Sequence, residues 1–279
     1  MEPRKHAIVT GAASGLGRAT SIALGRQGWH VAVADLNVAG SEETLSLVRA
    51  AGGDGQVERL DVTKAEEWVA LRDRLQATWP SLDLLMNNAG VGVGGEIGKL
   101  PLDDWKWIID INLYGAIYGC HALVEWLKSN PRGSHIVNIA SMAGVVSAPG
   151  MAPYNVTKAG MISLSETLYG ELKSHNVGVT AVCPSFFPTN IIVSGRFQSE
   201  GQKTMATRLM SKSGVTADDV AQLILRAIER RKLYVMVPFQ AVVFWWLKRL
   251  FPRYLLNLVA REFDRETTRQ QKRETASTP

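Results

Sequence analysis

Tyr154 and Lys158 lie four residues apart, a spacing that can support proton transfer at neutral pH. An alcohol that loses a hydride must also lose its hydroxyl proton, and a ketone that gains a hydride must gain a proton. Tyrosine has an unperturbed pKa of about 10, so only about one part in a thousand is phenolate at pH 7. An ammonium roughly 4–6 Å away would lower that pKa by about 1–3 pH units. Because residues at i and i+4 share one face of a helix, Lys158 is predicted to supply this ammonium.

A glycine-rich turn near the start of the chain is the second feature with chemical meaning. Its sequence is Thr10-Gly11-Ala12-Ala13-Ser14-Gly15-Leu16-Gly17, between an apolar strand pattern and a helical one. In that context the glycines allow a tight turn and a close backbone approach to a pyrophosphate, which the helix N-terminus then faces with unpaired N–H groups. A turn that serves packing alone is the alternative.

Asp35 ends the second predicted strand and could accept hydrogen bonds from both ribose hydroxyls of an adenosine. Its carboxylate would repel a 2′-phosphate, and the residues that follow, Leu36 and Asn37, carry no positive charge. Arg18 is the nearest basic residue, but it lies in the first predicted helix. The pattern favours NAD(H) over NADP(H), and an aspartate that only caps a strand end is the alternative.

Short β-branched segments alternate with longer amphipathic ones, as expected for parallel strands joined by crossover helices. The predicted strands are His6–Thr10, His30–Asp35, Gln56–Leu60, Leu82–Asn87, His135–Ala140, Gly178–Cys183 and Leu233–Val237. The predicted helices are Gly15–Gln27, Ser41–Ala51, Ala65–Trp79, Asp103–Ser129, Ala159–Ser174 and Ala217–Arg231. Right-handed crossovers then give an α/β fold, a doubly wound parallel sheet of about seven strands with helices on both faces. Its ligand crevice is expected at the carboxyl ends of the strands.

Taken together, these motifs resemble the short-chain dehydrogenase/reductase family over roughly Lys5–Val237. The resemblance is carried by the glycine spacing GxxxGxG, Asp61-Val62 after the third strand, Asn87-Asn88-Ala89-Gly90 after the fourth, Ser141, and the Tyr154–Lys158 pair. It implies a single Rossmann-type domain. It also implies that Tyr154 is the general acid/base and that Lys158 lowers the pKa of Tyr154 and holds the nicotinamide ribose. Ser141 would orient the substrate oxygen, and Asn112 would support a water that passes protons to Lys158.

The same resemblance implies a set of cofactor-binding residues. They are Gly11, Ser14, Gly15, Leu16, Gly17, Asp35, Asp61, Val62, Asn88, Ala89, Gly90, Tyr154, Lys158, Pro184 and Thr189. Ser185 stands where the family has a glycine, which leaves the backbone path under the nicotinamide open. No metal site is expected.

Beyond the motifs, we expect one domain over residues 1–263. Residues 186–214 form an irregular apolar insertion and are interpreted as a mobile lid over the substrate. In residues 239–258, apolar side chains nearly encircle a predicted helix and adjoin basic residues. That segment could meet a bilayer with anionic lipid, a second subunit, or the substrate pocket as its wall. Residues 264–279 are polar and of mixed charge, and are predicted to be a disordered tail.

Composition narrows the classes of function. The net charge is +5, but seven basic and no acidic residues lie between Arg230 and Arg261, so the excess is local and no nucleic-acid partner is expected. Cys120 and Cys183 lack any CxxC spacing and are interpreted as buried residues of a reducing compartment. No apolar stretch is long enough to span a membrane, and no signal peptide is recognised. A cytoplasmic protein, in some circumstances attached peripherally to a membrane, is therefore expected.

The prediction is an NAD(H)-dependent oxidoreductase that interconverts an alcohol and a ketone or aldehyde. The apolar segments favour a hydrophobic substrate such as a lipid, steroid, retinoid or long-chain alcohol, and the resemblance implies a homodimer or homotetramer. One alternative is a catalytically silent NAD(H)-sensing regulator at a membrane or partner surface. Another is an epimerase or dehydratase that uses the nicotinamide transiently. The set of Asn112, Ser141, Tyr154 and Lys158 argues against the sensor, which needs no proton relay.

Overall fold

The computed structural model describes residues 4–185, 187, 191–211 and 214–276. Its main sheet has seven strands in the order β3-β2-β1-β4-β6-β7-β9, and every neighbouring pair is parallel. The strands are β1 His6–Thr10, β2 His30–Asp35, β3 Asp54–Arg59, β4 Leu84–Asn87, β6 Ser134–Ile139, β7 Val177–Pro184 and β9 Tyr234–Val237. The order reverses between β1 and β4, so a crevice at their carboxyl ends is the expected ligand site. The predicted doubly wound sheet is confirmed.

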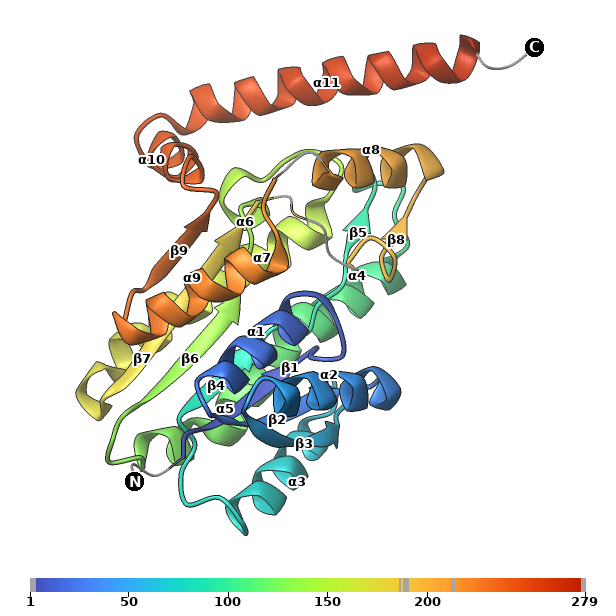
Figure 1. Ribbon diagram of the computed structural model, residues 1–279. Coiled ribbons are helices and arrows are strands. Elements are labelled where there is room, and N and C mark those ends of the chain that lie inside the picture. Colours follow the sequence, from blue (N-terminus) through green and yellow to red (C-terminus); the bar gives the residue numbers. More distant parts are fainter. Residues whose placement is uncertain (1–3, 186, 188–190, 212–213, 277–279) are drawn as a thin grey trace.

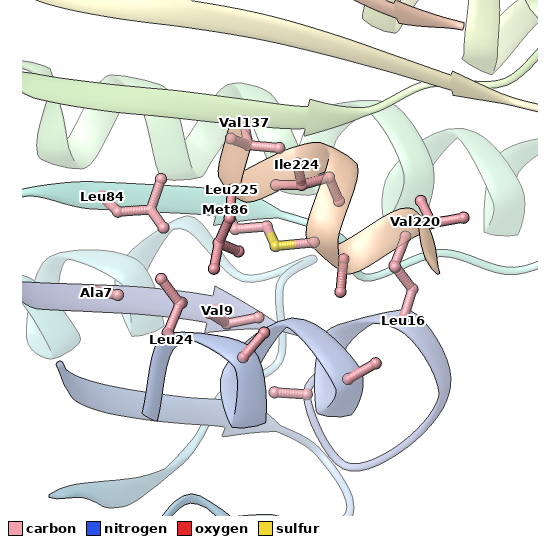
Figure 2. Close-up of a cluster of buried hydrophobic side chains, with 14 of the residues drawn as sticks. Ala7, Val9, Leu16, Leu24, Leu84, Met86, Val137, Val220, Ile224 and Leu225 are labelled. Atoms are coloured by element: carbon pink, nitrogen blue, oxygen red, sulfur yellow. The ribbon is translucent and has the colours of Figure 1, made fainter. Parts of the chain in front are cut away.

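Alternation along the strands divides the core into two layers, because successive side chains point to opposite faces of a sheet. Ala7 and Val9 of β1 lie in one buried cluster, and Ile8 lies in the other. The first cluster packs under helices α1 (Gly15–Arg26), α2 (Val38–Ala50) and α9 (Ala217–Glu229), and Figure 2 shows side chains of α1 and α9 meeting over β1 and β4. The second packs under α3 (Ala65–Gln76), α5 (Gly115–Lys128) and α7 (Ala152–Leu172).

The long helix predicted over Asp103–Ser129 is interrupted at its centre. The structure has α4 (Leu102–Ile109), a π-helical turn η1 (Asp110–Tyr114) and then α5. The helix predicted to begin at Ala159 begins at Ala152 instead, with a proline in its first turn, so α7 carries both Tyr154 and Lys158. A short helix α6 (Ala143–Val146) precedes α7, and a 3₁₀ turn η2 (Lys173–His175) follows it.

The segment after β7 is more ordered than its sequence suggests. Strand β8 (Arg196–Phe197) pairs with β5 (Val93–Gly94), and residues 200–211 form helix α8 (Glu200–Ser211), which lies above both strands in Figure 1. The prediction that residues 186–214 lack regular structure is therefore wrong for the residues of β8 and α8. Alanine, glutamine, lysine, arginine, leucine and methionine are good helix formers, and they make up much of α8.

The chain ends in two further helices, α10 (Ala241–Leu250) and α11 (Pro252–Ala276). Residues 264–276, predicted to be a disordered tail, continue α11, and residues 277–279 lie outside the described residues. Polarity alone misled that prediction, because arginine, glutamate, glutamine and lysine favour helix, and Arg265 pairs with Glu262 one turn earlier. Across the described ranges, no helix is long and apolar enough to cross a membrane.

Candidate active site

A cavity of about 1450 Å³ opens at the carboxyl ends of the strands. It is lined by the glycine turn after β1, by Asp35 at the end of β2, by Asp61 after β3 and by Tyr154 on α7. Pockets for one small ligand usually measure about 300–1,000 Å³. The cavity therefore has room for a dinucleotide and a substrate together.

The glycine turn has the geometry that an anion-binding loop requires. Gly11 has a φ of +62°, and a Cβ there would lie 2.8 Å from the Cα of Ala89. A Cβ on Gly17 would lie 2.3 Å from the carbonyl oxygen of Gly11, whereas one on Gly15 would meet no atom within 4 Å. Helix α1 then begins at N-cap Ser14 with neither a side-chain cap nor an acidic residue in its first turn. Its first N–H groups are thus suited to phosphate oxygens.

The Asn87-Asn88-Ala89-Gly90 segment holds this turn in place. The Asn88 side-chain Nδ2 donates to the carbonyls of Thr10 (2.8 Å) and Gly11 (3.1 Å). The backbone N–H groups of Asn88 and Ala89 donate to the Thr10 hydroxyl at 3.0 and 3.1 Å. The side chain of Asn87 donates to that of Asn138 on β6 at 2.8 Å. Thr10 is a positioning residue that the motif analysis did not single out, although a threonine directly before a glycine turn is its visible signal.

The Asp35 carboxylate faces the cavity with both oxygens already oriented by the backbone. Its Oδ2 accepts the N–H of Ala13 at 3.0 Å, and its Oδ1 accepts the N–H of Asn37 at 2.9 Å. Each carboxylate oxygen can accept a further hydrogen bond, so two hydroxyls could still bind here. Asp35 thus caps backbone N–H groups at the end of β2 and also presents its carboxylate to the cavity.

Arg18 is engaged in the packing of α1 against α2. Its Nη2 donates to the carbonyl of Ala13 at 2.6 Å and to the Glu43 carboxylate at 2.7 Å, and its Nε donates to the Thr44 hydroxyl at 2.9 Å. The guanidinium is thereby paired with a carboxylate, and Arg18 is not among the residues that line the cavity.

Asp61 and Val62, which follow β3, line the cavity. The Oδ1 of Asp61 accepts the N–H and the hydroxyl of Thr63 at 3.0 and 2.7 Å. The carbonyl of Val62 accepts the indole N–H of Trp68 at 3.1 Å. These hydrogen bonds therefore hold Asp61 and Val62 in fixed positions on the cavity wall.

Tyr154, Lys158 and Ser141 converge at the other end of the cavity. The Nζ of Lys158 lies 5.6 Å from the ring centroid of Tyr154 and donates to the carbonyl of Ile139 at 2.8 Å. The hydroxyl of Ser141 accepts the N–H of Ala143 at 3.1 Å and donates to the carbonyl of Pro184 at 3.3 Å. The spacing of the Tyr-Lys pair does bring the two groups together, as predicted.

Asn112 lies in the π-helical turn and does not itself line the cavity. Its Oδ1 accepts the N–H of Val91 at 2.8 Å, and its Nδ2 donates to the carbonyl of Val91 at 2.9 Å. Its Nδ2 also donates to the Thr157 hydroxyl at 3.4 Å, which in turn donates to the carbonyl of Tyr154 at 2.9 Å. Asn112 thus links the loop after β4 to the catalytic helix, and π-turns often occur at functional sites. Its predicted support of a water remains a prediction.

The electrostatics of the pair differ from the expectation. Burial raises the pKa of Tyr154 to about 12, and hydrogen bonding with Ser141 opposes this only in part. Burial lowers the pKa of Lys158 to about 8, so the ammonium form still prevails at pH 7. The phenol is therefore protonated at neutral pH, the form that a general acid needs. Burial sets the direction of this pKa shift, which the spacing of the two residues alone could not reveal.

The remaining predicted cofactor residues include Pro184 and Thr189, with Ser185 in the place of the family's glycine. The carbonyl of Pro184 accepts the N–H of Met142 at 2.9 Å, and the N–H of Ser185 donates to the carbonyl of Val237 at 2.6 Å. The backbone after β7 is thus held against β6 and β9 even though serine replaces the family's glycine. Thr189 lies outside the described residues. Gly17, which was predicted to bind the cofactor, packs against the backbone of Gly11 and does not line the cavity.

Outside the motif residues, most of the side chains that line the cavity are apolar, although Glu262 and Glu266 of α11 also line it. Its lining includes Trp107, Met142, Phe187, Ile192 and Phe197. The C-terminal helices complete the wall with Phe244, Leu258, Val259 and Phe263. A Cβ on Gly150 would lie 3.1 Å from the ring of Phe263, so α11 packs closely over the loop that precedes α7. Within residues 239–258, Phe244 and Leu258 line the cavity, which agrees with the pocket-wall alternative for these two residues.

The two cysteines are buried and unpaired, as predicted. Burial raises the pKa of each thiol, Cys120 and Cys183, to about 12. Both are therefore protonated and unreactive near neutral pH.

Fold and site together define a Rossmann-type protein with a glycine turn suited to a dinucleotide. The model of the short chain dehydrogenase family matches residues 5–198, and the chain belongs to the short-chain dehydrogenase/reductase family. Members of this family bind a nicotinamide cofactor.

Among its relatives is the "Probable oxidoreductase EphD" of Mycobacterium tuberculosis, 30% identical over 88% of this chain. The chain spans only 43% of the length of that relative. The "3-oxoacyl-[acyl-carrier-protein] reductase FabG" of Staphylococcus aureus is 31% identical over 83% of this chain and 94% of its own. Among solved structures, a short-chain dehydrogenase/reductase from Burkholderia phymatum in complex with NAD has a TM-score of 0.83 and 31% identity, covering 88% of this chain and 93% of that one.

Proposed function

We propose that this oxidoreductase interconverts an alcohol and a ketone or aldehyde, with NAD(H) as cofactor and a hydrophobic molecule as substrate. The observation that carries the proposal is the convergence of Tyr154, Ser141 and Lys158 on one cavity that also contains the glycine turn. In this arrangement Tyr154 moves the proton to or from the substrate oxygen. Ser141 orients that oxygen, and Lys158 places a positive charge beneath both groups.

The residues present fit a dinucleotide. The α1 N-terminus with Gly15 would hold the pyrophosphate, Asp35 the adenosine ribose, and Lys158 the nicotinamide ribose. When bound, the nicotinamide would supply or accept the hydride. Preference for NAD(H) is supported by the two oriented oxygens of Asp35 and by the pairing of Arg18 with Glu43.

A hydrophobic substrate is supported by the apolar side chains that line the cavity beyond Tyr154. The name of the Staphylococcus aureus relative describes a reductase of 3-oxoacyl chains, which is consistent with an apolar tail on a ketone. A lipid, steroid, retinoid or long-chain alcohol has the same character. Either direction of the reaction is compatible with this site.

We also propose a cytoplasmic homodimer or homotetramer with peripheral membrane contact through the C-terminal segment. Assembly is supported by exposed apolar side chains on η1 and α7, namely Tyr114, Val156 and Tyr169. Membrane contact would bring an apolar substrate to the cavity.

The test is a panel of hydrophobic alcohols and ketones followed at the NADH absorbance, with NADP(H) in parallel and Tyr154→Phe as the variant. We expect turnover by the parent enzyme and a loss of about 10²–10⁴-fold in Tyr154→Phe, with NADH affinity little changed. Tyr169→Phe on the same helix is the matched control and should retain activity, because it loses only a hydroxyl that lies outside the cavity lining. Undiminished turnover by Tyr154→Phe would refute the assignment. NADH binding by a parent protein that turns over nothing in the panel would favour the regulator instead.

A further inference from the structure

An exposed apolar surface lies on the C-terminal helices. We name it the C-terminal apolar surface and define it by six side chains: Phe239, Val243, Trp246, Leu250, Phe251 and Tyr254. Phe239 is 83% exposed, Tyr254 65% and Leu250 63%. Scattered apolar residues on a protein surface are normal, but a contiguous group of this size usually marks an interaction site.

The spacing of these residues gives them a common direction. Val243, Trp246 and Leu250 recur at intervals of three and four, so they share one side of α10. The opposite side attaches α10 to the domain: Ala241 is buried, and the ring of Trp245 lies 4.7 Å from that of Tyr234 on β9. The apolar stripe is therefore directed away from the domain. In Figure 1, α10 and α11 form the outermost layer at this end of the molecule, beyond β9 and α6.

The charges of the segment itself are of one sign. Between Pro238 and Arg261 the chain has four basic residues and no acidic one. These are Lys248, Arg249, Arg253 and Arg261. Arg249 stacks on Trp245 at 3.6 Å and lies 3.9 Å from Glu166, while Arg253 is exposed at the start of α11. The remaining basic residues of the run, Arg230 to Lys232, precede β9. They therefore lie at its amino end, whereas α10 follows its carboxyl end.

The surface is also continuous with the cavity. Phe244 and Leu258 both line the cavity and are 40% and 46% exposed, so apolar contact extends from the outer face to the cavity wall. A second copy seated on this surface would bring two sets of basic residues together, which like-charge repulsion opposes. An anionic lipid surface avoids this repulsion.

We propose that α10 and the start of α11 dock on an anionic lipid bilayer, with the C-terminal apolar surface inserted at the headgroup boundary and the exposed Arg253 facing lipid phosphates. Tryptophan and tyrosine favour that boundary, and adjoining lysine and arginine favour anionic lipid. Docking needs no turnover. Only its use for delivery of substrate to the cavity depends on the proposed function.

The test is flotation of the full-length protein with vesicles of phosphatidylcholine, alone or mixed with phosphatidylserine. We expect binding to the mixed vesicles, a reduction of about tenfold or more on neutral vesicles, and weakening by added salt. The double variant Trp246→Ser/Leu250→Ser should lose about tenfold or more of the binding to mixed vesicles. Leu102→Ser, which removes an 83% exposed leucine on α4, is the matched control and should bind like the parent.

Several results would overturn the inference. They are failure of the parent to float, equal binding to neutral and anionic vesicles, and full binding by the double variant. A concentration-dependent dimer that the double variant abolishes, without vesicle binding by the parent, would assign the surface to a second copy. Unchanged thermal unfolding and NADH affinity of the double variant establish that it is folded. Repeating the flotation with Tyr154→Phe separates docking from catalysis, because a protein without turnover should still float.

Discussion

Replacing Lys158 by methionine should stabilise the folded protein while abolishing its turnover. The ammonium is buried and burial lowers its pKa from 10.5 to about 8, so the folded state at pH 7 carries a charge that water would solvate better. That difference corresponds to about 3 kcal/mol of lost stability below pH 8. Methionine keeps the length of the side chain but loses the hydrogen bond to the Ile139 carbonyl, worth about 1–2 kcal/mol. The expected net gain at pH 7 is therefore about 1–2 kcal/mol.

The pH dependence identifies the cause. Because the folded pKa is lowered, the unfolded chain binds one more proton than the folded chain between pH 8 and 10.5, and the stability of the parent rises with pH over that range. Between pH 7 and 9.5 the parent should gain about 2 kcal/mol relative to Lys158→Met. Comparing the two proteins cancels the other groups that titrate.

Urea unfolding of both proteins at pH 7 and 9.5 measures this difference. Lys99→Met, which removes an exposed ammonium beside Glu96, is the matched control and should show no such change relative to the parent. If the stability difference between parent and Lys158→Met is the same at both pH values, Lys158 does not titrate near pH 8 in the folded protein. The reasoning from burial would then fail.

Two further predictions concern Asp35 at the end of β2 and Gly17 of the glycine turn. Asp35→Ser should lower the ratio of kcat/KM with NAD to kcat/KM with NADP by about tenfold or more. The substitution removes both the proposed acceptor for the ribose hydroxyls and the negative charge that would repel a 2′-phosphate. An unchanged ratio in parallel assays would contradict the role assigned to the carboxylate. Gly17→Ala should lower the free energy of unfolding by about 1–3 kcal/mol and weaken NADH binding, because its Cβ would lie 2.3 Å from the Gly11 carbonyl oxygen. Gly170→Ala, whose Cβ would meet no atom within 4 Å, is the control and should be neutral or stabilising in the same urea titration.

The predictable part of this fold is its local and repetitive part. Strands such as His30–Asp35 are short apolar runs bounded by turns, and the Tyr154–Lys158 pair is set by helical spacing, so both could be located from residue order. The two-residue strands β5 and β8 could not be, because they form only where segments about a hundred residues apart meet. Likewise no periodicity distinguishes the π-turn that holds Asn112 from the α-helix on either side.

The electrostatic prediction failed for a related reason. A sequence shows that a lysine and a tyrosine are neighbours, but the pKa of Tyr154 depends on how much water reaches its hydroxyl. Burial is contributed by the whole cavity wall, including Phe187 and the C-terminal helices. Only the assembled tertiary structure contains that information.

The family match ends at residue 198, whereas α10 and α11 begin after residue 240 and supply part of the cavity wall. Tyr154 and Lys158 thus belong to the matched stretch, but part of the wall that buries them comes from beyond it. Substitutions in the final two helices should therefore change which molecules the cavity admits and, through the burial of Tyr154, the acidity of its phenol as well.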